Sequence, residues 1–103
     1  MPKKTDVVIV GGGVLGCSIA YQLAKLGIKS TLLERARLAA GASGATAGVV
    51  GPLWHVEPGL NSAFSLGMRS LDMFPDLADE LLETGIAPGF RQNGILKLAF
   101  TLE

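Results

Sequence analysis

The first 35 residues carry two different hydrophobic patterns in succession. A continuous β-branched run at residues 7–10 predicts a strand buried on both faces, as in a parallel sheet. Apolar residues then recur at helical spacing over residues 14–26, and Gly27 follows them as a left-handed helix cap. Residues 31–33 predict a second strand. Strand, helix and strand over about residues 5–35 therefore form one βαβ unit with parallel strands.

The rest of the chain has other patterns. Residues 41–51 are nearly all small, which predicts an irregular loop. An apolar stripe predicts a helical segment over about residues 61–84, with a kink or a restart at Pro75 because proline cannot donate a backbone hydrogen bond. Alternating residues predict a further strand over about residues 94–100. The sequence thus predicts an α/β fold in which helices and one more strand follow the βαβ unit.

Composition excludes several classes of partner. Nine basic and nine acidic residues cancel among 103, which disfavours nucleic acid or an anionic membrane as a partner. The single cysteine excludes an internal disulfide. Because the chain also has only one histidine, no metal site is expected. No apolar run reaches the roughly 20 residues of a transmembrane helix. Residues 14–17 imitate a lipoprotein cleavage site, but Asp6 and the glycines at 11–13 disfavour a signal peptide, so we expect a cytoplasmic protein.

Residues 11–16 match the dinucleotide-binding pattern G-x-G-x-x-G. The pattern alone is weak, because about one chain in four with 14 glycines among 103 residues would contain it by chance. Its context is more informative: the loop follows a strand, opens a helix, and precedes Glu34, which lies 18 residues after Gly16. Together these features predict a Rossmann-like unit that binds FAD, NAD or NADP. Of these three, NADP is disfavoured by the acid at position 34.

Each position of this pattern has a physical reason. Gly11 permits the tight turn from strand to helix, Gly13 lets the backbone approach a diphosphate, and Gly16 lets the helix pack closely on the strand. The helix that begins at Val14 directs unpaired N–H groups and its positive dipole end at the diphosphate. Glu34 is positioned to accept hydrogen bonds from ribose hydroxyls.

The loop at residues 41–51 offers a second set of contacts. Its backbone N–H groups and the hydroxyls of Ser43 and Thr46 would complete a diphosphate cradle opposite the first loop. From composition alone, a flexible surface loop fits equally well.

Longer segments carry a resemblance to a known family. They are D-V-V-I-V-G-G-G-V-L-G from Asp6, L-L-E-R from Leu32, and G-A-S-G-A-T-A-G-V-V-G from Gly41. Together they resemble the D-amino-acid oxidase superfamily of FAD-dependent oxidoreductases. Residues 51–57 and 91–101 are similar to those of glycine oxidases, whereas sarcosine oxidase-like proteins and subunits of dye-linked dehydrogenases share the earlier motifs.

The resemblance implies FAD as the cofactor and a small amine or amino acid as the substrate. In such enzymes the amine is oxidised by hydride transfer to the flavin, water hydrolyses the resulting imine, and oxygen reoxidises the flavin. No residue of this chain is implied as catalytic. His55 is interpreted as structural or solvent-facing, Trp54 as a packing or interface residue, and Cys17 as a small packing residue. The implied cofactor-binding residues are Gly11, Gly13, Val14, Leu15, Gly16, Ala42 and Ser43 at the diphosphate, Glu34 at the ribose, Arg35 beside the adenine, and Thr46, Ala47, Gly48 and Val49 toward the flavin ring.

Members of this superfamily are several times longer than this chain. Residues 1–103 are therefore expected to form the N-terminal part of a FAD-binding domain, as a fragment of a larger enzyme, a remnant, or a small subunit completed by a partner chain. An incomplete domain leaves an apolar sheet face uncovered, so we expect self-association or a partner subunit. The alternative functions are a non-catalytic nucleotide-binding subunit, a fragment of a dye-linked dehydrogenase, and an NAD-binding dehydrogenase fragment.

Overall fold

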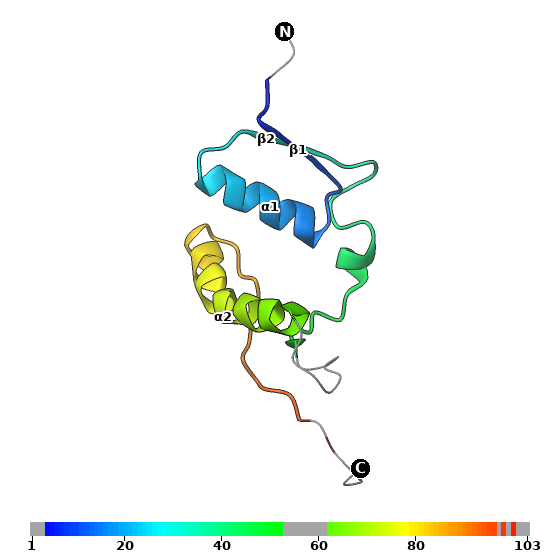
Figure 1. Ribbon diagram of the computed structural model, residues 1–103, viewed down its shortest axis with the longest axis vertical. Helices are drawn as coiled ribbons and strands as arrows, with labels where there is room; N and C mark the ends of the chain where they lie inside the picture. The colour runs from blue at the N-terminus through cyan, green and yellow to red at the C-terminus, as the bar shows by residue number, and fades with distance from the viewer. Residues whose placement is uncertain (1–3, 53–61, 97, 99, 101–103) are drawn as a thin grey trace. The chain divides into compact units, whose positions relative to one another are not determined.

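The chain divides into two compact units, Met1–Gly48 and Val49–Glu103. The computed structural model describes residues 4–52, 62–96, 98 and 100. In chain order the elements are β1 (Val7–Val10), α1 (Val14–Lys25), β2 (Ser30–Leu33), the short 3-10 helix η1 (Ala42–Ala45) and α2 (Ser62–Glu83). The first four belong to the first unit, and α2 belongs to the second (Figure 1).

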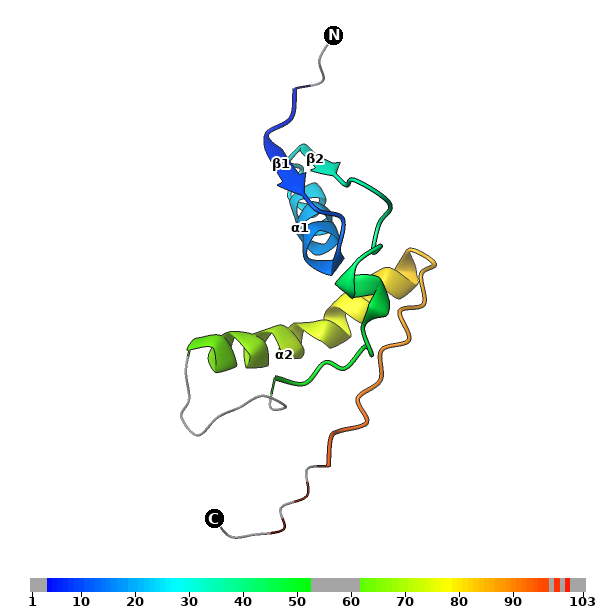
Figure 2. The same cartoon turned by 90° about the vertical axis from the view of Figure 1, so that its right-hand side faces the viewer.

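The first unit is built on two parallel strands joined by a helix. β1 pairs with β2 so that Val7 lies opposite Ser30 and Val10 lies opposite Leu33. α1 connects the strands and runs beside them (Figures 1 and 2). Because the strands are parallel, their carboxyl ends meet at one edge of the sheet, where dinucleotides bind in open α/β folds. The predicted βαβ unit is confirmed.

The prediction that β1 is buried on both faces is wrong. Ile9, on the face covered by α1, is only 8% exposed, whereas its neighbours Val8 and Val10 are 56% and 84% exposed. A parallel sheet is buried on both sides only when helices cover both sides. Among the described residues of this unit, α1 is the one long helix, and it covers one face.

The end of α1 was predicted correctly from Gly27. This residue has a φ of +73°, which glycine adopts without steric cost. The N–H of Gly27 donates to the carbonyl of Ala24 at 3.0 Å, and the N–H of Ile28 donates to that of Leu23 at 2.9 Å. These two bonds form a Schellman motif, which satisfies carbonyls at the helix end and returns the chain toward β2.

In the second unit, α2 is one continuous helix of 22 residues with Pro75 inside it. Of the two predicted alternatives at Pro75, a kink or a restart, the restart does not occur, and the ribbon of α2 changes direction along its length (Figure 1). Because proline has no backbone N–H, the hydrogen bond that another residue at this position would donate to the carbonyl of Leu71 is missing, but the turns on either side continue. The helix ends at Glu83. Gly85, two residues further on, has a φ of +86°, and the N–H of Ile86 donates to the carbonyl of Leu81 at 3.0 Å.

The strand predicted over about residues 94–100 is not seen in the part of this range that the structure describes. Residues 94–96, 98 and 100, which are the described part of this range, belong to no strand. Leu96 and Phe100 are 84% and 90% exposed. An alternating sequence becomes a strand only when another segment pairs with it, and no segment in the described part of the chain does so.

Within the described ranges, no helix is long and apolar enough to cross a membrane. The same part of the chain brings together no group of three histidine, cysteine or acidic side chains that would hold a metal ion.

Candidate dinucleotide-binding site

The loop between β1 and α1 makes a sharp turn that depends on glycine. Gly11 has a φ of +105°, in the left-handed region that side chains rarely adopt. Its N–H still donates to the carbonyl of Leu33 at 2.8 Å, so the loop begins as a continuation of the sheet. Gly16 is buried, and a Cβ on it would overlap the carbonyl oxygen of Gly11. The turn at Gly11 and the close packing of α1 on it therefore depend on each other.

The beginning of α1 presents backbone donors. Among the described residues, the N–H groups of Gly13, Leu15 and Gly16 have no hydrogen-bond partner. The N–H of Val14 donates to the hydroxyl of Ser43 at 2.8 Å. Unpaired N–H groups at a helix N-terminus, together with the positive end of the helix dipole, favour an anion such as a diphosphate.

Glu34 follows β2 and its carboxylate is held against the loop. One oxygen accepts from the N–H of Gly12 at 2.7 Å, and the other accepts from the N–H of Ala36 at 2.9 Å. The Gly12 hydrogen bond lowers the pKa of Glu34, and the Ala36 bond and the charge of Arg35 lower it further. The carboxylate is thus ionised and fixed at the edge where both strands end, with lone pairs left to accept from further donors.

The segment after Glu34 wraps around the same loop. The N–H of Ala39 donates to the carbonyl of Gly12 at 2.9 Å. Further along, Ser43 of η1 lies over the start of α1, since a Cβ added to Gly13 would be 2.9 Å from its hydroxyl oxygen. The first part of the second glycine-rich segment therefore lies beside the first loop, and in this structure it is not a free surface loop.

The predicted residues fall into two groups. Gly11, Gly13, Val14, Leu15, Gly16, Glu34 and Ser43 come together at this edge, with Arg35 next to Glu34 and Ala42 next to Ser43 in the chain. Among the described residues, Thr46, Ala47 and Gly48 make no hydrogen bond to the loop; the hydroxyl of Thr46 accepts from the N–H of Gly48 at 3.2 Å. Val49 belongs to the second unit. Trp54 and His55 lie outside the described residues.

Sequence reasoning missed two residues of this site. Gly12 donates its N–H to Glu34 and accepts at its carbonyl from Ala39 and from the thiol of Cys17, at 3.6 Å. Leu38 lies against Gly12, with its Cδ2 2.6 Å from where a Gly12 Cβ would be. Gly12 occupies an unspecified position of the motif, but three consecutive glycines signalled a crowded backbone. Leu38 gave no signal beyond being the bulky residue among small ones.

The hydrogen bonds of Glu34 predict a dependence on pH. Because the pKa of Glu34 is lowered in the folded chain, its contribution to stability is complete above the ordinary pKa of 4.5. That contribution is lost as the pH falls through the lowered value, when the protonated carboxyl releases Gly12. We expect the amide resonance of Gly12 to titrate below pH 4.5, the ordinary pKa from which that of Glu34 is lowered, and this titration to vanish in Glu34→Gln. An inflection of the Gly12 resonance above the ordinary pKa of Glu34, or one that survives the substitution, would show that Glu34 does not accept this hydrogen bond.

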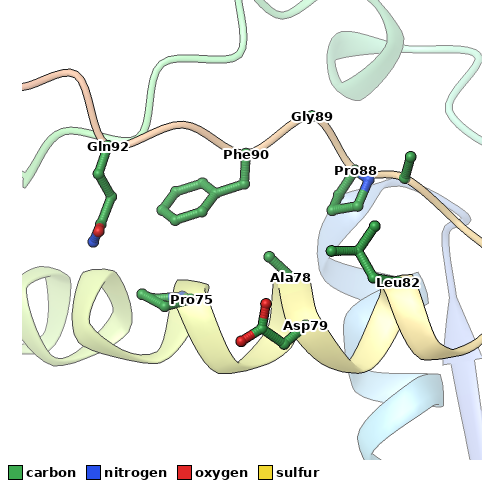
Figure 3. Close-up of a pocket in the computed structure, with 9 residues that line it drawn as sticks. Pro75, Ala78, Asp79, Leu82, Pro88, Gly89, Phe90 and Gln92 are labelled. Atoms are coloured by element: carbon green, nitrogen blue, oxygen red, sulfur yellow. The ribbon is translucent and has the colours of Figure 1, made fainter.

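The second unit contains a groove of about 410 Å³. Figure 3 shows Phe90 and Gln92 projecting toward the part of α2 that carries Pro75 and Ala78, while Pro88 lies opposite Leu82. Phe90 also stacks on Phe74, with ring centroids 5.6 Å apart. The residues that line the groove are Pro75, Ala78, Asp79, Leu82, Ala87, Pro88, Gly89, Phe90 and Gln92. With Asp79 as its only ionisable lining residue, this groove offers no pair of groups for acid–base chemistry.

Four features together define a Rossmann-type dinucleotide-binding protein. They are the parallel βαβ unit, the glycine turn, the free N–H groups at the start of the helix and the carboxylate after the second strand. Comparison with known proteins identifies the family. The family model described as FAD dependent oxidoreductase matches residues 6–103. The chain belongs to this family.

Individual relatives agree with this assignment. The chain is 38% identical over 104 residues to a glycine oxidase from Geobacillus kaustophilus (strain HTA426), covering 100% of this chain and 27% of the relative. It is 40% identical over 100 residues to the mitochondrial sarcosine dehydrogenase of Mus musculus, covering 96% of this chain and 10% of the relative. The crystal structure of glycine oxidase from Bacillus cereus ATCC 14579 matches with a TM-score of 0.76 at 42% identity, over 85% of this chain and 23% of that one. The chain thus spans about a quarter of the length of these glycine oxidases.

Proposed function

We propose that this chain supplies the part of a FAD site that holds the ADP half of the cofactor, within an oxidoreductase that acts on the C–N bond of a small amine or amino acid. The observation that carries the proposal is the edge where β1 and β2 end. There, the free N–H groups of Gly13, Leu15 and Gly16 lie beside the ionised carboxylate of Glu34. A dinucleotide needs both a cradle for its diphosphate and an acceptor for its sugar hydroxyls.

The residues present fit the cofactor. Gly13 has an unstrained, extended backbone with a φ of −82°, so glycine is not required here by its conformation. A side chain at this position would instead crowd the hydroxyl of Ser43 at the helix start, because an added Cβ would be 2.9 Å from it. Leu15 and Gly16 would donate to the diphosphate, and Ser43 would donate its hydroxyl hydrogen while its oxygen keeps the N–H of Val14. Glu34 would accept from the ribose hydroxyls while retaining Gly12 and Ala36. The flavin, when bound, supplies the site that accepts a hydride from the amine.

The substrate class rests on the names of the relatives. Alongside glycine oxidase and sarcosine dehydrogenase, human mitochondrial dimethylglycine dehydrogenase is 37% identical over 99 residues, covering 95% of this chain and 11% of the relative. Glycine, sarcosine and dimethylglycine differ only in carrying no, one or two N-methyl groups. We infer a substrate of this kind for the complete protein.

The proposal is tested by binding and by spectroscopy. We expect the protein, stripped of ligand, to bind FAD and ADP competitively at one site, and bound FAD to show the flavin absorption band. Glycine, sarcosine and dimethylglycine should then bleach that band in the absence of oxygen. Tight binding of NAD without any binding of FAD would overturn the proposal.

A second function is favoured by one relative. The mitochondrial pyruvate dehydrogenase phosphatase regulatory subunit of Mus musculus is 36% identical over 104 residues, covering 98% of this chain and 11% of the relative. A protein that is named as a regulatory subunit thus contains a similar segment, which supports a nucleotide-binding module without chemistry of its own. FAD that binds but is not bleached by any of the three amines would favour this second function. Self-association, a partner subunit and a cytoplasmic location stay predictions.

A further inference from the structure

Leu38 occupies an unusual place beside the dinucleotide loop. Its side chain is 59% exposed, although leucine is among the residues that folding most often buries. The point where a Gly12 Cβ would stand is 2.6 Å from Cδ2 of Leu38 and 3.2 Å from both Cβ and Cγ of Glu34. The two side chains therefore converge on the bare Cα of Gly12, one apolar and the other ending in a fixed carboxylate.

The backbone around Leu38 is locked to this loop. Ala39 donates its N–H to the carbonyl of Gly12 at 2.9 Å, and Ala40 donates to the carbonyl of Arg37 at 3.1 Å. Ala39 has a φ of +57°, the only positive value at a described residue other than glycine. Such a backbone is costly for alanine, by about 1 kcal/mol or more. The chain thus accepts local strain to hold Leu38 beside the carboxylate that would bind the sugar.

We propose that Leu38 is a specificity-determining residue that packs against the adenine base of the bound nucleotide. The inference rests on the proposed function and deepens it by assigning a residue to the base. If Glu34 binds the ribose hydroxyls, the base attached to that ribose lies within reach of side chains adjoining Glu34. A fixed, exposed aliphatic side chain offers the flat face of a purine an apolar surface, and contact would remove both surfaces from water. Leu38 would recognise the base, while the helix start recognises the phosphates.

The competing explanation is that Leu38 only supports Gly12. The two are separated by comparing ADP with ribose 5-diphosphate, which has the same sugar and phosphates but no base. Calorimetric titration of the full chain and of Leu38→Ala with both ligands is the experiment. Leu38→Asn, of similar size but polar, is a second variant, and Leu26→Ala is the control, because Leu26 is an exposed leucine at the far end of α1. Thermal unfolding checks that every variant folds.

We expect Leu38→Ala and Leu38→Asn to weaken ADP binding by about 5- to 10-fold, as loss of a partly buried aliphatic contact does. Binding of ribose 5-diphosphate should stay within about twofold, and Leu26→Ala should change neither ligand. Equal weakening of both ligands would mean that Leu38 only supports the loop, and unchanged ADP binding would mean that it does not contact the base; either result overturns the inference. Binding of neither ligand to the unaltered chain would overturn the proposed function and this inference with it.

Discussion

Gly13→Val is expected to weaken the binding of ADP and FAD by at least about 100-fold while the protein remains folded. A Cβ at this position would be 2.9 Å from the hydroxyl oxygen of Ser43, and the valine methyl groups would extend further into the space in front of α1. The substitution therefore displaces Ser43 from the N–H of Val14 and blocks the diphosphate. Loss of two charge-assisted contacts at about 1.5 kcal/mol each accounts for this magnitude.

The backbone itself tolerates this substitution. Gly13 has a φ of −82° and a ψ of −173°, an extended conformation that valine adopts readily. Ser18→Val is the matched control, since it adds a valine to an exposed position one turn further along the same helix. Isothermal titration with ADP measures both variants. Retention of ADP affinity in Gly13→Val would show that no phosphate lies at the start of α1.

Gly16→Ala is expected to destabilise the folded protein by about 3 kcal/mol, which lowers the thermal midpoint by about 10 °C or more. The added Cβ would overlap the carbonyl oxygen of Gly11, a backbone atom. Gly11 itself is fixed by its left-handed φ and by its hydrogen bond to Leu33, so the overlap can be relieved only by moving α1 away from the sheet.

Gly41→Ala is the control for this second prediction. An added Cβ at Gly41 meets no atom within 4 Å, so we expect a change of no more than about 0.5–1 kcal/mol. Urea and thermal unfolding, followed by circular dichroism, measure both variants. Equal stability of Gly16→Ala and the unaltered protein would contradict the close packing of α1 on the loop.

The parts of the fold predicted from the sequence are those fixed by local chemistry. The glycine turn, the change from a β-branched run to helical spacing, and Gly27 as a helix cap each depend on residues within a few positions, and the structure confirms them. The position of Glu34 followed from topology, because parallel strands bring their carboxyl ends to one edge.

The failures concern contacts between segments distant in the sequence. The residues of 94–100 have a strand-like alternation, but a strand requires a pairing partner that no local pattern reveals. Likewise Val8 and Val10 are as apolar as buried strand residues, yet α1 covers only the other face of the sheet. Of the kink or restart predicted at Pro75, the restart does not occur, because the turns on either side of the missing hydrogen bond continue as one helix.

The same distinction holds for the site. Gly13, Gly16 and Glu34 could be predicted because their spacing follows from the geometry of the motif. The role of Gly12 could not be predicted, because it depends on which backbone N–H the carboxylate of Glu34 reaches. The position of Leu38 could not be predicted either, because it depends on the path of the chain after β2. The hydrogen bond from the N–H of Ala39 to the carbonyl of Gly12 sets that path.

The account depends most on the claim that the start of α1 binds a diphosphate. Titrating the isotopically labelled protein with ADP and following its backbone amide resonances tests this claim directly. We predict the largest shifts at the amides of Gly13, Leu15 and Gly16, saturating together with a shift at Gly12. Shifts confined to other parts of the chain, or none at ADP concentrations that saturate binding, would contradict it.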